Sequence, residues 1–218
     1  MRARARELAT ADPDLARVLE VYGPPPMWGR APTFGTLIHL ILEQQVSLAS
    51  ARAAMDRLVE RIGEPTPDGV LALDDDALLE IGFSRQKRTY ARDLARRVRD
   101  GDLDLARLGD LDDADVRDEL TAVKGIGAWT ADIFLLMALG RPDSWPVGDR
   151  ALVVAARALR GLETDPTVEE MEAIGDAWRP WRSVAARILW HFYLCEIRPP
   201  GGRQNRRKAA TLTADQVS

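Results

Sequence analysis

The sequence predicts an all-α fold, and three observations support this prediction. Apolar residues recur at three- and four-residue spacing along most of the chain, which places them on one face of a helix. No segment shows the strict apolar and polar alternation of a half-buried strand. Serine, threonine and aspartate, which cap helices well, stand just before many of the apolar patterns. With 218 residues and 46% hydrophobic content, the chain is long enough to bury a core.

Polar residues and glycines mark the helix ends in the first half of the chain. Ser47 and Ser84 can each accept a hydrogen bond from a first-turn amide, while Gly63 and Gly101 suit the conformation that ends many helices. In order, the expected helices are residues 33–43, residues 47–62, a short helix from Thr66 and Pro67, another from Asp74, and a long amphipathic helix between Ser84 and Gly101.

The second half continues this chain of short helices. In order, the expected helices are residues 112–122, 128–139 and 149–159, one that opens at Thr167, and one over about residues 181–195. Thr167 and Glu170 have the spacing of a capping box. Residues 199–218 contain little to bury, so we expect a loose tail there.

Composition excludes several classes of protein. The formal net charge is −4, so any contact with nucleic acid must be local rather than due to bulk attraction. The single cysteine, Cys195, cannot form an internal disulfide or hold a four-cysteine iron–sulfur cluster or zinc site. No apolar stretch is long enough to span a bilayer, and no export signal is visible. We therefore expect a cytoplasmic protein.

The segment from Lys124 to Gly127 joins two apolar helical patterns by a Gly-x-Gly turn. Such a turn lets the backbone approach a phosphate, and the following helix offers unpaired amides at its positive end. The alternative is an ordinary corner, in which the glycines only end one helix and begin the next. Asp149 also has a functional and a structural interpretation, because an aspartate at a helix start can be a simple N-cap.

Five segments together resemble the helix-hairpin-helix (HhH-GPD) DNA glycosylase superfamily over about residues 34–193. They are LTAVKGIGAWTADIFLL, WPVGDRALVVAARAL, LIHLILEQQVSLASARAAMDRLVERIG, IGFSRQKRTYARDLA and AWRPWRSVAARILWHFY, the last typical of the 3-methyladenine DNA glycosylase II branch. The resemblance implies one compact helical unit over residues 1–198 with two lobes, at about 34–110 and 111–198, and the N-terminal segment packed on the second lobe. The N-terminal mixed α/β domain of some relatives is expected to be missing.

The resemblance also implies roles for individual residues. Asp149 corresponds to the catalytic aspartate, which would stabilise positive charge on the deoxyribose or activate water. Trp129 stands where bifunctional relatives carry a lysine nucleophile, so no lyase activity is expected. Trp129 and Trp190 resemble the aromatic wall of the base pocket, with Phe134 and Trp181 as neighbours. Ile133 replaces a tyrosine of some relatives. Buried core positions are the alternative for these aromatic residues.

The expected DNA contacts come from three segments. The turn after the first family helix resembles an intercalating loop, with Gln45 as the side chain that fills the space of a flipped nucleotide; a solvated loop is the alternative. The expected DNA-binding residues are Gln44, Gln45, Val46, Arg85, Lys87, Lys124, Gly125, Ile126, Gly127, Ala128 and Thr130. The backbone carbonyls of Lys124 and Ile126 are candidates for a monovalent cation, and no organic cofactor or iron–sulfur cluster is implied.

The function implied is a monomeric, monofunctional glycosylase that removes alkylated purines such as 3-methyladenine or 7-methylguanine from double-stranded DNA. Two alternatives stay open. One is a non-catalytic module that binds damaged DNA. The other is a glycosylase for uracil, hypoxanthine or 1-methyladenine.

Overall fold

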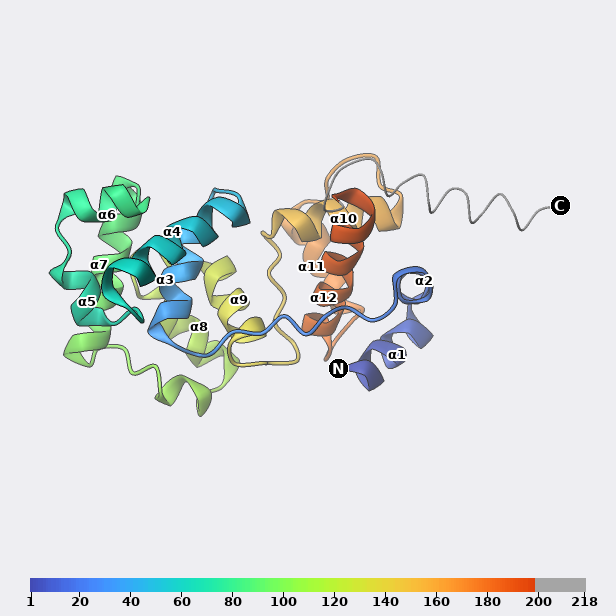
Figure 1. The fold of residues 1–218 in the computed structure, drawn as a ribbon. Helices are drawn as coiled ribbons and strands as arrows, with labels where there is room; N and C mark the ends of the chain where they lie inside the picture. The colour runs from blue at the N-terminus through green and yellow to red at the C-terminus, as the bar shows by residue number, and fades with distance from the viewer. Residues whose placement is uncertain (199–218) are drawn as a thin grey trace. The chain divides into compact units, whose positions relative to one another are not determined.

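The computed structural model describes residues 1–198, and no strand occurs in that range (Figure 1). The prediction of an all-α fold is therefore confirmed. The chain folds into two units, which we call the central unit (residues 28–144) and the terminal unit (residues 1–27 together with the segment from residue 145 onward). The tail expected over residues 199–218 lies outside the described residues. None of the described helices has the length and apolar character needed to cross a bilayer.

The central unit is built around one helix that is apolar on nearly every face. Its helices are α3 (Phe34–Glu43), α4 (Leu48–Ile62), α5 (Pro67–Ala72), α6 (Asp75–Ile81), α7 (Arg85–Asp100), a 3₁₀ turn (Arg107–Gly109), α8 (Asp113–Thr121) and α9 (Ala128–Met137). Leu37, Ile38, Leu40 and Ile41 of α3 have no exposed surface, as expected of a helix in a protein core. Helices α4, α7 and α9 pack against α3.

The terminal unit surrounds α12, whose residues 183–190 are all buried. Its helices are α1 (Arg2–Ala11), α2 (Pro13–Tyr22), α10 (Arg150–Arg160), α11 (Val168–Asp176), α12 (Arg182–Phe192) and a π-helical turn (Tyr193–Ile197). Helices α1, α2, α10 and α11 all contact α12. The last helix was expected to continue to residue 195, but regular α-helix ends at Phe192 and the wider turn follows.

The predicted helix starts are confirmed by their hydrogen bonds. Eight of the predicted starts have a side chain that accepts a backbone amide of the first turn: Thr33, Ser47, Thr66, Asp74, Ser84, Asp112, Asp149 and Thr167. Thr167 and Glu170 form the predicted capping box. Helix α12 has no side-chain cap at Trp181, and neither does α9, whose N-cap is Gly127. The first-turn amides of α9 therefore depend on some other acceptor.

The boundary between the two units differs from the expected lobe boundary near residue 111. Residues 111–144 belong to the central unit. The physical reason is that α9 buries residues 130–136 and packs against α3 and α8. The hairpin is thus part of the same hydrophobic core as the first family helices.

Two N-terminal helices, α1 and α2, were not expected from the sequence. Asp12 joins them, accepting the amides of Asp14 at 3.0 Å and Leu15 at 3.2 Å as the N-cap of α2. The same carboxylate accepts the indole N–H of Trp178 at 2.8 Å and the guanidinium of Arg160 at 2.5 Å. These bonds fix the N-terminal segment to α10 and to the residues after α11.

Candidate nucleic-acid interface and catalytic carboxylate

The hairpin between α8 and α9 presents an uncapped helix start. Gly125 has φ +88°, a left-handed conformation that favours glycine. Gly127 is the N-cap of α9 and contributes no side chain. The first turn of α9 therefore offers backbone N–H groups at the positive end of the helix dipole, which is a site suited to a phosphate.

Two residues of α7 support this hairpin, and the sequence alone did not reveal either. A Cβ at Gly125 would lie 2.1 Å from Cγ of Tyr90, so the aromatic ring packs directly on the glycine backbone. Asp93, one turn further along α7, accepts the backbone N–H of Lys124 at 2.9 Å. Their three-residue spacing puts both on one face of the helix. That spacing is the available signal in the sequence, but it also fits an ordinary amphipathic helix.

The loop after α3 also contacts the hairpin. The side-chain amide of Gln44 donates to the carbonyl oxygen of Gly125 at 2.9 Å and to the hydroxyl of Thr130 at 3.2 Å. The ammonium of Lys87, near the start of α7, donates to the carbonyl oxygen of Leu42 at 2.7 Å. The structure thus brings together the three segments from which DNA contacts were expected.

The predicted DNA-binding residues divide into an exposed set and a supporting set. The exposed residues are Gln45, Val46, Arg85, Lys124, Gly127 and Ala128. Within residues 1–198 the side chains of Arg85 and Lys124 have no ion-pair partner. Gln45 has φ +58°, which is unusual for any residue other than glycine. Such a backbone outlier is typical of functional loops.

Three of the predicted contacts have structural roles instead. Thr130 is 1% exposed and bonded to Gln44, so its hydroxyl faces the protein. The Ile126 side chain is buried as well. Burial lowers the pKa of Lys87, and its ammonium binds the carbonyl oxygen of Leu42 in the last turn of α3. The prediction that Lys87 contacts phosphate is therefore corrected in favour of a bond to the C-terminal end of α3.

Asp149 lies in the terminal unit at the N-terminus of α10. Its Oδ1 accepts the amides of Ala151 and Leu152, each at 3.0 Å. It also accepts the indole N–H of Trp190, on α12, at 3.0 Å. The carboxylate is half-buried, so three donors hold a charged group in a defined place close to solvent.

The residues expected to form the base pocket do not share one environment. Trp129, in the first turn of α9, is partly buried, while Ile133, one turn further along the same helix, is 3% exposed. Phe134 is completely buried, so it belongs to the core of the central unit and offers no surface to a base. The prediction for Phe134 is corrected accordingly.

The prediction that Trp181 borders the base pocket is also corrected. The guanidinium of Arg4 lies 4.1 Å from the centre of its ring, and its indole N–H donates to Glu7 at 3.2 Å. Both partners belong to α1. Trp181 therefore attaches α1 to the rest of the terminal unit, with its ring face against Arg4 and its indole N–H bonded to Glu7.

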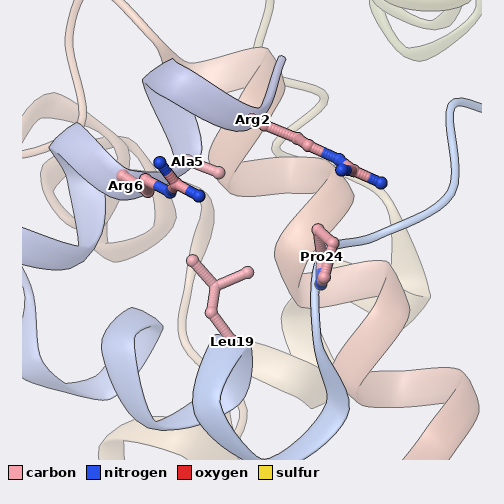
Figure 2. Close-up of a pocket in the computed structure, with 5 residues that line it drawn as sticks. All are labelled: Arg2, Ala5, Arg6, Leu19 and Pro24. Carbon is pink, nitrogen blue, oxygen red and sulfur yellow. The ribbon is translucent and has the colours of Figure 1, made fainter.

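A pocket of the terminal unit is lined by other residues. It has a volume of about 380 Å³ and is lined by Arg2, Ala5, Arg6, Leu19 and Pro24. In Figure 2 the two arginines extend from α1 on either side, and Leu19 points towards the pocket from α2. None of these five is a predicted site residue. Within residues 1–198 no cluster of three or more histidine, cysteine or acidic side chains is placed to bind a metal.

Comparisons with known proteins indicate the family of the chain. A family model described as HhH-GPD superfamily base excision DNA repair protein matches residues 38–180. The DNA-3-methyladenine glycosidase structure from Bacillus halodurans is 32% identical, with a TM-score of 0.71, and the match covers 87% of this chain and 88% of that one. The 3-methyladenine DNA glycosylase of Schizosaccharomyces pombe, solved with abasic DNA, is 25% identical with a TM-score of 0.76, over 86% of this chain and 95% of that one.

Curated relatives point to the same family. A DNA-3-methyladenine glycosylase of Bacillus subtilis is 28% identical over 84% of this chain. The chain spans 64% and 65% of the length of the two Bacillus subtilis relatives that it matches. From the family model and the similarity to the Bacillus halodurans structure, we conclude that the chain belongs to the HhH-GPD superfamily of base excision DNA repair proteins, in its 3-methyladenine glycosylase branch.

Proposed function

We propose that this protein is a monofunctional DNA glycosylase that hydrolyses the N-glycosidic bond of alkylated purines in double-stranded DNA and leaves an abasic site. The observation that carries the proposal is the carboxylate of Asp149, fixed at the N-terminus of α10 by three N–H donors. In a protein of this family, a fixed and half-buried carboxylate is the group that glycosidic cleavage requires.

The role of Asp149 follows from the charge of the transition state. As the base leaves, positive charge develops on the deoxyribose, as in other glycosyl transfers. A carboxylate at about 4 Å and an effective dielectric of about 20 stabilises that charge by about 4 kcal/mol, or roughly a thousandfold in rate. Water then attacks the sugar carbon and releases a proton, so neither an organic cofactor nor a lysine nucleophile takes part.

The class of base follows from the leaving group. A purine methylated on a ring nitrogen is a cation and departs as a neutral molecule, so no general acid is needed. Such a cation is attracted to the face of an aromatic ring. The partly accessible indole of Trp129, in the first turn of α9, supports this substrate class. Since Trp129 cannot form a Schiff base, the strand is left uncut.

Duplex DNA is the proposed partner of the central unit. The uncapped start of α9 would bind one phosphate, and the exposed cations Arg85 and Lys124 would add charge. The exposed Gln45 would occupy the space left by the flipped nucleotide. A monovalent cation on the carbonyls of Lys124 and Ile126, a monomeric state and a cytoplasmic location stay predictions.

The proposal is tested by incubating the protein with methylated duplex DNA and with oligonucleotides that contain uracil or hypoxanthine. We expect free 3-methyladenine or 7-methylguanine, together with strands that break only after alkali. If only uracil or hypoxanthine is released, that base, and not an alkylated purine, is the substrate. Strand cleavage without alkali would contradict the monofunctional assignment. Binding to damaged DNA without release of any base would favour a non-catalytic module.

A further inference from the structure

The indole of Trp190 has one polar atom, and that atom is committed to Asp149. The distance from Nε1 of Trp190 to Oδ1 of Asp149 is 3.0 Å. The residue is 8% exposed, so most of its ring is covered. A buried indole N–H needs an acceptor, and here the acceptor is the proposed catalytic carboxylate. The sequence suggested a different use for this ring, as a wall against the base.

Three N–H donors converge on one oxygen of Asp149, Oδ1. Ala151, Leu152 and Trp190 each donate to Oδ1 at 3.0 Å. One carboxylate oxygen has about two lone-pair sites, so three donors saturate it. The first two donors belong to the backbone of α10, while the third comes from α12 and fixes the remaining rotation of the carboxylate.

We propose that Trp190 is a positioning residue for the proposed glycosidic cleavage, which acts by holding Oδ1 of Asp149 and thereby fixing the orientation of the carboxylate. This inference rests on the proposed function of Asp149. It gives the Trp190 N–H the role of orienting the carboxylate whose charge stabilises the sugar.

This role differs from a base-stacking role in a measurable way. The sugar is the same for every lesion, so a displaced carboxylate slows the release of each base by the same factor. A stacking residue instead affects cationic and neutral bases differently, because its attraction depends on the charge of the base. A displacement of about 1 Å in a catalytic group can cost on the order of 100-fold in rate.

The experiment measures single-turnover base release at saturating enzyme from duplexes that contain 7-methylguanine or hypoxanthine, for the wild type and Trp190→Phe. Phenylalanine keeps an aromatic ring and removes the N–H. We expect the rate constant to fall by about 10- to 100-fold, by the same factor for both bases, with unchanged affinity for DNA. In the Asp149→Asn background, Trp190→Phe should have no further effect, because the two residues act as one unit.

Two controls separate this role from stability. Trp178→Phe removes a buried indole N–H that donates to another carboxylate of the terminal unit, and should leave the rate constant unchanged. Replacing Trp190 by 3-benzothienylalanine keeps the bicyclic shape without the N–H and should reproduce the loss. Because the rate constant at saturating enzyme does not depend on the folded fraction, partial unfolding would lower only the amplitude.

Either of two results would overturn the inference. One is a loss for 7-methylguanine that is absent for hypoxanthine. The other is a full additional loss from Trp190→Phe in the Asp149→Asn background. A failure of the proposed function looks different: the wild type would release neither base, or Asp149→Asn alone would be as active as the wild type.

Discussion

Replacing Gly125 by alanine tests whether the hairpin binds DNA through its backbone. Its φ of +88° costs an alanine about 1–2 kcal/mol. In addition, the new Cβ would lie 2.1 Å from the ring of Tyr90, more than 1 Å closer than an ordinary contact at 3.4 Å. The hairpin must therefore move by about 1 Å. That movement breaks the bonds from Gln44 to Gly125 and from Lys124 to Asp93, both 2.9 Å long.

The expected effect on DNA binding follows from the amides of α9. A hydrogen bond to a charged group contributes about 1.5–3 kcal/mol, so losing one amide-to-phosphate bond weakens binding by roughly 10- to 100-fold. The assay is the fluorescence anisotropy of a labelled undamaged duplex, titrated with Gly125→Ala at several salt concentrations. The dependence of affinity on salt should become shallower if a phosphate contact is lost.

Gly101→Ala is the matched control, because Gly101 has φ +84° in the same unit and an added Cβ would meet no neighbouring atom within 4 Å. It should lower stability by a similar backbone cost and leave DNA affinity unchanged. In Gly125→Ala combined with Tyr90→Ala, the ring is gone and part of the affinity should return. Wild-type affinity for Gly125→Ala alone would refute the reasoning, as would an equal loss for Gly101→Ala.

Three further predictions concern other parts of the molecule. Burial acts to raise the pKa of Asp12, but hydrogen bonds from Trp178 and Arg160 outweigh it and lower the pKa below its usual value. The lowered pKa stabilises the folded protein above about pH 4, and this stabilisation is lost as pH falls through the folded pKa. Asp12→Asn should therefore lower the free energy of unfolding by about 2 kcal/mol at pH 7 and by less in acid, as measured by thermal melts at several pH values; an equal loss at every pH would contradict this. Gln45→Gly should keep or raise the melting temperature, because φ +58° suits glycine, yet should slow excision from paired duplex more than from a mismatched site; equal slowing at both sites would count against a plugging role. Trp129→Leu should slow release of 7-methylguanine more than release of hypoxanthine, and equal effects in a competition assay would exclude a cation–π contact.

The helix starts could be predicted because capping is local. Thr33, Ser84 and Thr167 each bond to an amide three residues away, so the sequence within one turn contains the needed information. Residues far apart in the sequence offered no such signal. The N-terminal helices are fixed by bonds between Asp12 and Arg160, 148 residues apart, and no local pattern reveals that pairing.

The direction in which side chains point accounts for the remaining differences between the predicted site and the structure. Trp129 and Phe134 both lie on α9, but only the fold decides which of them points into the core. Lys87 has a charge suited to phosphate, and the carbonyl of Leu42 that captures it comes from another helix. The resemblance to a family identified Asp149 as the candidate catalytic residue. The donor from Trp190 that fixes its orientation could be found only in the structure.

The central claim, that the carboxylate of Asp149 drives base release, is tested most directly by comparing the wild type with Asp149→Asn on methylated duplex DNA. Asparagine keeps the shape and can still accept the N–H groups at Oδ1, so the change removes mainly the charge. The account predicts unchanged DNA affinity and a single-turnover rate constant about a thousandfold lower. A rate constant within a few fold of the wild type would contradict it.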